Sequence, residues 1–212
     1  MSLAAKQEQP VVLIVDDDES LQNSLSSLLR SIGMKVETLT SPAEFSTAKI
    51  PDSPCCMLLD VRMPGTSGLD FQRQLEAIGV HIPIIFMTGY GDIPMTVKAM
   101  KAGAIEFLTK PCRTQDILDA VQVAIQRSRE QRDRDKSIAK LDSAFRLLTP
   151  REKEVLAFVV SGRMNKQIAA DLRISEITVK VHRGNVMKNG RTVVGGAGQD
   201  GGRPRSSYFL GF

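Results

Sequence analysis

Residues 11–18, Val-Val-Leu-Ile-Val-Asp-Asp-Asp, decide the fold. A short apolar run that ends in carboxylates predicts a strand buried on both faces, with charged side chains where the strand stops. Within the first 125 residues, helical segments separate four more apolar runs: Val36–Leu39, Cys56–Leu59, Ile82–Met87 and Ile105–Leu108. Strands that alternate with helices in this way predict an α/β domain, with a five-stranded, parallel, doubly wound sheet covered by helices on both faces.

The second part of the chain is organised differently. Residues 113–146 form one polar helical stretch, and a helical linker is expected over residues 126–147. This helix is either a solvated linker or a surface that pairs with a second copy, although its middle heptads lack apolar contact residues. Residues 148–188 predict a small all-α domain, because a capping box at Thr149–Glu152 opens it and a short turn at Arg173-Ile174 joins two helices. Seven of the 24 residues in 189–212 are glycine, so this tail is expected to be disordered.

Composition and charge exclude several classes of protein. The chain is 42% hydrophobic and 25% charged, and no apolar run approaches the roughly 20 residues of a membrane-spanning helix. Three cysteines and a polar N-terminus predict a reducing cytoplasm and no contact with a membrane. Residues 1–125 hold 10 Lys and Arg against 15 Asp and Glu, whereas residues 126–212 hold 18 against 9. The basic second half favours a polyanionic partner, of which nucleic acid is the obvious candidate.

Polar side chains follow four of the five predicted strands. They are Asp16 and Asp17 after the first strand, Asp60 after the third, Thr88 after the fourth and Lys110 after the fifth. Because ligands bind outside the carboxyl ends of strands in open α/β sheets, we expect these residues to converge on one site. Oxygen ligands alone favour Mg²⁺. Asp60 is then the predicted nucleophile that forms an aspartyl phosphate, while Mg²⁺ and Lys110 neutralise the phosphoryl oxygens and Thr88 donates a hydrogen bond.

Four motifs in this half resemble the receiver domain of two-component response regulators, which has a flavodoxin-like fold. They are Val15-Asp16-Asp17-Asp18, Leu59–Gly65, Met87-Thr88-Gly89 and Thr109-Lys110-Pro111. The resemblance, over roughly residues 10–125, implies that Asp60 accepts a phosphoryl group from a sensor histidine kinase. It also implies that Asp17 binds Mg²⁺ directly, that Asp16 binds it largely through water, and that the backbone carbonyl of Arg62 completes the metal site.

The same resemblance implies a conformational switch. In the family, a threonine hydroxyl moves toward the phosphoryl group and an aromatic ring on the fifth strand turns inward behind it. Thr88 and Phe107 occupy those positions, although Phe107 is alternatively a permanent part of the core. The expected result is a homodimer that forms on phosphorylation through the helix at about 93–102 and the fifth strand.

From Leu148 onward the chain resembles the LuxR-type helix-turn-helix, so that the chain through about Lys188 is similar to FixJ/NarL-family regulators that bind promoter DNA. Helical geometry independently sorts the recognition helix, because Val179, His182 and Val186 share one face that should pack inward. On the opposite face, Lys180 can reach guanine edges or phosphates, and Val181 can contact a thymine methyl. The six candidate DNA contacts are Lys166, Thr178, Lys180, Val181, Arg183 and Lys188, of which Lys166 and Arg183 are alternatively solvated charges.

Two features depart from the pattern of that family. Arg173 lies in the turn, where a glycine would adopt positive φ freely and an arginine costs about 1–2 kcal/mol. The family also has a fourth helix after the recognition helix, and here the Gly-rich tail takes its place. A change of reading frame near codon 188 is one hypothesis. Residues 193–202 can be written with synonymous codons that encode a different peptide when they are read one nucleotide later. This peptide, Ser-Leu-Val-Glu-Leu-Val-Arg-Met-Ala, is amphipathic, as the missing helix would be.

These observations leave rival functions. The leading hypothesis is a transcription regulator switched by phosphorylation of Asp60. The alternative is a phosphoryl-accepting interaction protein, or phosphate sink, whose DNA-binding domain is defective. A Mg²⁺-dependent phosphohydrolase is disfavoured, because such enzymes need a second Asp two residues beyond the nucleophile and Arg62 stands there. We therefore expect that the chain is not an enzyme.

Overall fold

The computed structural model describes residues 8–45, 50–89, 91 and 93–194, with side chains described as far as residue 188. The chain divides into two compact units, Met1–Asp133 and Arg134–Phe212. Helix α5, Thr114–Arg146, is continuous across the division, as the polar helical pattern of residues 113–146 predicts.

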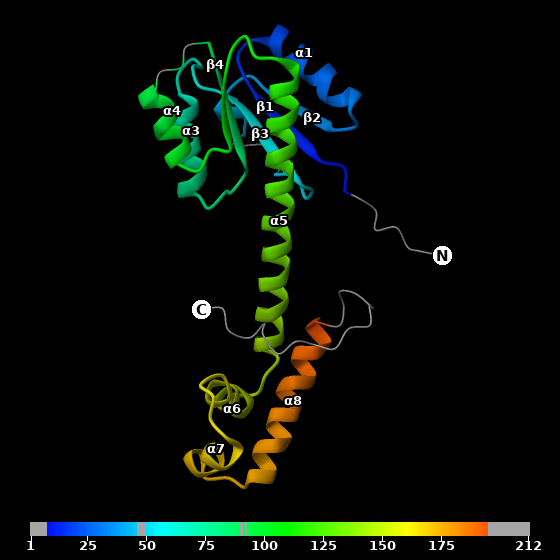
Figure 1. The fold of residues 1–212 in the computed structure, drawn as a ribbon, viewed down its shortest axis with the longest axis vertical. Helices are drawn as coiled ribbons and strands as arrows, with labels where there is room; N and C mark the ends of the chain where they lie inside the picture. The colour runs from blue at the N-terminus through cyan, green and yellow to red at the C-terminus, as the bar shows by residue number, and fades with distance from the viewer. Residues whose placement is uncertain (1–7, 46–49, 90, 92, 195–212) are drawn as a thin grey trace, which may run out of the picture. The chain divides into compact units, whose positions relative to one another are not determined.

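The first unit is built on a sheet of five parallel strands in the order β2-β1-β3-β4-β5 (Figure 1). The strands are β1 (Val11–Val15), β2 (Lys35–Leu39), β3 (Cys55–Asp60), β4 (Ile84–Thr88) and β5 (Glu106–Thr109). Strands β1, β3 and β4 are buried along their whole length, whereas β2 lies at the edge and exposes Lys35, Glu37 and Thr38. The predicted fold class is therefore confirmed, although the two edge strands, β2 and β5, are not buried on both faces.

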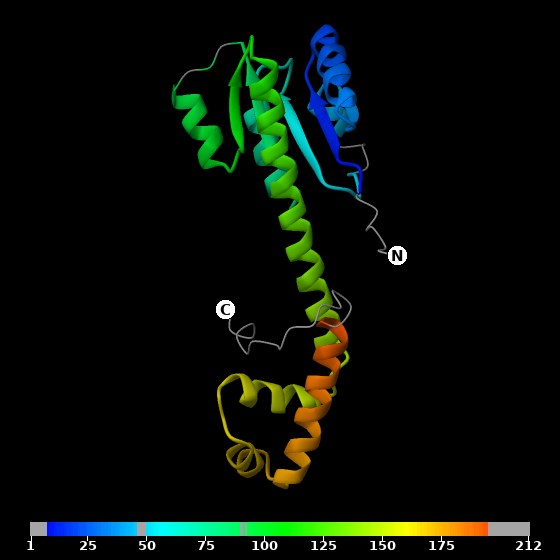
Figure 2. The ribbon, with the colours of Figure 1, turned by 45° about the vertical axis from the view of Figure 1, so that its right-hand side comes forward.

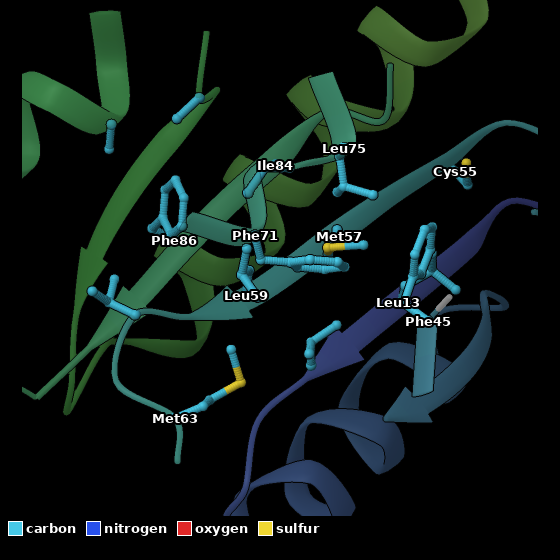
Figure 3. Close-up of a cluster of buried hydrophobic side chains, with 14 of the residues drawn as sticks. Leu13, Phe45, Cys55, Met57, Leu59, Met63, Phe71, Leu75, Ile84 and Phe86 are labelled. Atoms are coloured by element: carbon cyan, nitrogen blue, oxygen red, sulfur yellow. The ribbon is translucent and has the colours of Figure 1, made fainter. Parts of the chain in front are cut away.

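Helices cover both faces of this sheet. They are α1 (Glu19–Ser31), α2 (Pro42–Phe45), α3 (Gly68–Ala77), α4 (Ile93–Lys101) and the first part of α5. On one face, Phe71 and Leu75 of α3 pack against Met57 and Leu59 of β3 (Figure 3). On the other face, residues of α1 and α5 pack against the alternate residues Val12 and Ile14 of β1. The helix residues in this cluster include Leu25 and Leu29 of α1 and Ile117 and Val121 of α5. The doubly wound arrangement follows from this alternation, because successive strand residues point to opposite faces.

Asp18 explains how the chain leaves β1. Its carboxylate is the N-cap of α1 and accepts hydrogen bonds from the backbone N–H groups of Ser20 (2.9 Å) and Leu21 (3.1 Å). Asp16 and Asp17 therefore lie between the end of β1 at Val15 and the N-cap of α1 at Asp18.

Among its described residues, the second unit contains three further helices, α6 (Pro150–Val160), α7 (Asn165–Leu172) and α8 (Glu176–Val194) (Figure 2). The predicted capping box is present, since Thr149 and Glu152 exchange hydrogen bonds between side chain and backbone. One side chain from each helix forms a small buried core: Val155, Ile168 and Val179. A core of this size supports a helix-turn-helix with little stability to spare.

The turn between α7 and α8 adopts the predicted strained conformation. Arg173 has φ 50° and ψ 47°, the left-handed region, and is the one non-glycine residue with positive φ within the described ranges. Its side chain is exposed.

The prediction that the recognition helix ends near Lys188 is wrong. Helix α8 continues to Val194, so the segment 189–194 is helical rather than part of an irregular tail. The single glycine of that segment is followed by Arg191, Thr192, Val193 and Val194, which a helix tolerates. The rest of the predicted disordered tail, residues 195–212, lies outside the described residues.

Candidate functional site

The carboxyl end of the sheet brings three of the predicted residues into direct contact. The ammonium Nζ of Lys110, just after β5, donates hydrogen bonds to Asp16 Oδ2 after β1 and to Asp60 Oδ1 at the end of β3, both at 2.6 Å. The second oxygen of Asp60 accepts from the backbone N–H of Arg62 at 2.7 Å. Because β1 and β3 are neighbours and β5 lies two strands beyond β3, only a long side chain such as lysine can join the three strand ends.

Burial and charge oppose one another at Asp60. The residue is 6% exposed, and burial raises the pKa of its carboxyl above the ordinary value, against the lowering effect of Lys110. Burial alone would lower the pKa of the Lys110 ammonium, but the hydrogen bonds to Asp16 and Asp60 outweigh it and raise that pKa. The site therefore holds a firmly protonated lysine beside a carboxylate that lacks much of its hydration, which is a suitable nucleophile for a phosphoryl group.

Thr88 and Phe107 border this site on the β4 and β5 side. Thr88 is fully buried at the end of β4, and its carbonyl accepts from the backbone N–H of Lys110 at 2.7 Å. Phe107 is half-buried, and its ring centroid lies 6.1 Å from that of Phe86, its partner across the two strands. Thr88 is thus connected to Lys110 through a backbone hydrogen bond. The Lys110–Pro111 peptide bond is cis.

The donor atoms at this site fit Mg²⁺ in part. Oxygens of Asp16 and Asp60 converge on one cationic point, now held by Lys110 Nζ, and Mg²⁺ is commonly bound by one or two carboxylates together with water and phosphate oxygens. Asp17 is exposed and makes no hydrogen bond or ion pair within the described part of the chain. Among the described residues no group of three or more His, Cys, Asp or Glu side chains forms a metal cluster. Asp16 and Asp60 are the two carboxylates that the structure brings together at this point.

Two residues that support the site were missed by sequence reasoning. Gln22 of α1 is buried, and its Nε2 donates to the backbone carbonyls of Asp16 (2.5 Å) and Leu39 (2.8 Å). Gly68 begins α3 so close to Asp60 that a Cβ there would lie 2.3 Å from the Asp60 carbonyl oxygen. Neither residue carries a local signal, because a buried glutamine in a helix and a glycine at its start are both common without such roles.

The helix-turn-helix presents the predicted faces of α8. Val179 is buried and His182 and Val186 are half-buried, whereas Ile177 is 75% exposed and Val181 56% exposed. Of the six candidate DNA contacts, four are exposed: Lys166, Lys180, Val181 and Lys188.

The other two candidates have partners within the unit. Arg183 donates to Asn165 Oδ1 at 3.1 Å, and the Thr178 hydroxyl lies 2.7 Å from that of Ser175. The half-buried His182 keeps its Nδ1 without a hydrogen-bond partner among the described residues, which fits the predicted packing role.

Comparison with known families decides the identity of both units. Residues 12–122 match the family described as response regulator receiver domain, and residues 146–189 match the bacterial regulatory proteins of the luxR family. The chain is a DNA-binding response regulator. It belongs to the FixJ/NarL type, in which the receiver precedes a LuxR-type helix-turn-helix. Proteins of this family are transcriptional regulators rather than enzymes.

Relatives of this response regulator cover most of its length. Nodulation protein W of Bradyrhizobium diazoefficiens is 51% identical over 85% of the chain and 80% of its own length. Response regulator protein TmoT of Ectopseudomonas mendocina is 49% identical over 85% of the chain and 82% of its own length. The solved structure of response regulator StyR is 49% identical in sequence, with a TM-score of 0.77. The match covers 85% of this chain and 91% of the StyR chain. Full-length FixJ from B. japonicum is 33% identical with a TM-score of 0.53, over 84% and 88% of the two chains.

None of the helices within the described residues is long and apolar enough to cross a membrane.

Proposed function

We propose that Asp60 of this response regulator is phosphorylated by a sensor histidine kinase, and that the phosphorylated chain dimerises and binds promoter DNA to regulate transcription. The observation that carries the proposal is the contact of one lysine ammonium with Asp16 and Asp60 at the buried end of the sheet. This arrangement offers an anionic nucleophile and, beside it, a fixed positive charge for the oxygens of an incoming phosphoryl group. We place this activity in the cytoplasm, where a kinase and promoter DNA are both accessible.

The reaction is a phosphoryl transfer between a phosphohistidine and a carboxylate. An oxygen of Asp60 attacks phosphorus, the P–N bond to the kinase histidine breaks with its electron pair leaving on nitrogen, and a mixed carboxylic–phosphoric anhydride forms. The ammonium of Lys110 pairs with a phosphoryl oxygen, and the Thr88 hydroxyl donates to another. Mg²⁺ held by Asp16 and Asp60, with Asp17 and the Arg62 carbonyl as the further proposed ligands, supplies additional positive charge for these oxygens when it is bound.

The proposed dimer uses the outer face of α4. Ile93 is 81% exposed, Val97 43% and Met100 42%, so this short helix presents an apolar surface near the end of the sheet that holds Thr88. A second copy of the chain would bury these side chains symmetrically. The phosphoryl group favours the dimer by binding one conformer of β4, α4 and β5 more tightly than the other.

The proposed DNA contacts extend from α7 and α8. Lys180 and Val181 lie on the exposed face of α8 and are placed to meet base edges, while Lys166 and Lys188 are placed to meet phosphates. Thr178 and Arg183 are also proposed to contact phosphates, and their hydrogen bonds to Ser175 and Asn165 would fix their orientation.

The decisive experiment is acid-labile labelling with a ³²P-containing small-molecule phosphodonor. The parent chain should incorporate label in the presence of Mg²⁺, and Asp60→Asn should incorporate none. Asp119→Asn, which removes an exposed carboxylate from α5, is the matched control and should label as the parent does. Undiminished labelling of Asp60→Asn would show that another residue accepts the phosphoryl group.

A phosphate sink with a defective DNA-binding domain is the second candidate. It is favoured by the match to the luxR family, which stops at residue 189, directly before the Gly-rich sequence. Titration of a palindromic promoter fragment at several salt concentrations separates the two functions. A regulator should bind the promoter far more tightly than random DNA at equal salt, whereas a sink should bind both equally.

A further inference from the structure

Gly91, in the segment between β4 and α4, lies directly against the ring of Phe107. A Cβ built on Gly91 would stand 2.8 Å from Phe107 Cε1 and 3.6 Å from Phe107 Cζ. The first distance is shorter than real Cβ atoms tolerate. Five other described glycines have positive φ, but Gly91 does not, so no left-handed backbone conformation calls for glycine at this position. The ring, rather than the backbone, requires glycine at this position.

The same point in space touches the other switch residue. The missing Cβ would stand 3.3 Å from Cγ2 of Thr88, which is itself fully buried. The carbonyl of Thr88 accepts a hydrogen bond from the backbone N–H of Lys110. Thr88, which contacts the Gly91 position, is therefore hydrogen-bonded to the lysine whose ammonium contacts Asp60. Gly91 therefore borders Thr88 and Phe107 together, at one backbone hydrogen bond from the acidic site.

We propose that Gly91 is a positioning residue for the switch, because its missing side chain provides the place in which the Phe107 ring rests. The proposal rests on the proposed function, since it concerns how phosphorylation of Asp60 reaches β5. A methyl group at position 91 would overlap Phe107 Cε1, so the ring has to shift or take another rotamer whether or not Asp60 carries a phosphoryl group. The substitution thus removes one of the two ring positions between which the phosphoryl group would select.

Gly89 offers a matched control within the same segment. It also has no positive φ, and a Cβ built on it meets no atom within 4 Å. Gly89→Ala and Gly91→Ala therefore add the same methyl group two residues apart, and only the second meets the Phe107 ring.

The test follows the Phe107 ring directly by ¹⁹F NMR of the full chain labelled with 4-fluorophenylalanine, in which the Phe107→Leu variant assigns the resonance among the eight phenylalanines. Without any phosphodonor, the Phe107 resonance should move in Gly91→Ala and stay in place in Gly89→Ala. On addition of beryllofluoride with Mg²⁺, it should shift in the parent and in Gly89→Ala, and the shift should be lost in Gly91→Ala.

A double substitution separates positioning from simple loss of stability. Gly91→Ala should lower the Tm of the parent by more than it lowers that of Phe107→Leu, because leucine does not extend to the position of Cε1 and only the contact with Thr88 remains. An unchanged Phe107 resonance in Gly91→Ala would overturn the inference, and so would a beryllofluoride shift in that variant as large as the shift of a responding parent. Failure of the proposed function has a different signature, namely no beryllofluoride response in the parent chain together with a moved resonance in Gly91→Ala.

Discussion

Replacing Arg173 with glycine should stabilise the helix-turn-helix. Arg173 has φ 50° and ψ 47°, close to the centre of the left-handed region, where the Cβ of an L-residue meets the following carbonyl oxygen. Its exposed guanidinium makes no hydrogen bond or ion pair within the described part of the chain. Removal of the side chain therefore relieves backbone strain without breaking a contact.

The size of the effect follows from two opposing contributions. Relief of the left-handed conformation is worth about 1–2 kcal/mol. The greater freedom of glycine in the unfolded chain takes back roughly 0.4–1 kcal/mol. The net gain in the free energy of unfolding is about 0.7 kcal/mol, which corresponds to roughly a threefold decrease in the population of the open form.

Amide hydrogen exchange of α7 and α8 measures this gain separately from the receiver, because exchange reports the opening of each region. The buried amides near Ile168 and Val179 should exchange about threefold more slowly in Arg173→Gly than in the parent, under conditions in which exchange follows the opening equilibrium. Arg173→Ala removes the same charge but keeps the Cβ, and should exchange at the parent rate. Equal protection in the glycine and alanine variants would refute the argument from backbone strain.

Three further outcomes test the site and the caps. Lys110→Ala should still accept label but should not dimerise when phosphorylated, as measured by light scattering, and normal dimerisation would place the role of the lysine elsewhere. Asp60→Asn should raise the Tm of the metal-free receiver at pH 7, because burial raises the folded-state pKa of Asp60 and its ionised form opposes folding. That advantage should fade as the pH falls through the raised pKa and vanish below the unfolded value of about 3.9, and an advantage independent of pH would contradict the assignment. Thr149→Ala should lower the free energy of unfolding of the second unit by about 1 kcal/mol in urea, whereas Thr149→Ser, which keeps the cap, should not.

Local patterns predicted the elements of this protein well, because strands, caps and helix faces depend on neighbours in the sequence. The apolar run at Val11–Val15 is β1 to the residue, and the capping box at Thr149 opens α6. The inward face of α8 follows from the 100° spacing of its residues, and Val179 is indeed buried. The positive φ of Arg173 was predictable for the same reason, since the turn between two helices constrains it locally.

The residues that sequence reasoning missed act across long separations. Gln22 reaches Leu39, 17 positions away, and Gly91 meets Phe107 from the next βα unit. Their roles depend on which backbone lies beside them, and one sequence does not contain that information. The exposure of β2 was missed for a similar reason, because an apolar run does not reveal whether its strand has one neighbour or two.

The contacts of Lys110 explain why the proposed chemistry should move the protein. In the structure its ammonium is shared between Asp16 and Asp60, so the site holds two carboxylates and one lysine. An aspartyl phosphate replaces the single negative charge of the Asp60 carboxylate with up to about two negative charges on the phosphoryl oxygens, and Lys110 has only three N–H donors with which to pair them. Its attraction to the phosphoryl group must therefore compete with its bond to Asp16. The backbone N–H of Lys110 donates a hydrogen bond to the Thr88 carbonyl. A displacement of Lys110 should therefore shift the end of β4 as well as the end of β5. In the proposed mechanism, Lys110 therefore connects the acidic site to Thr88 through one backbone hydrogen bond.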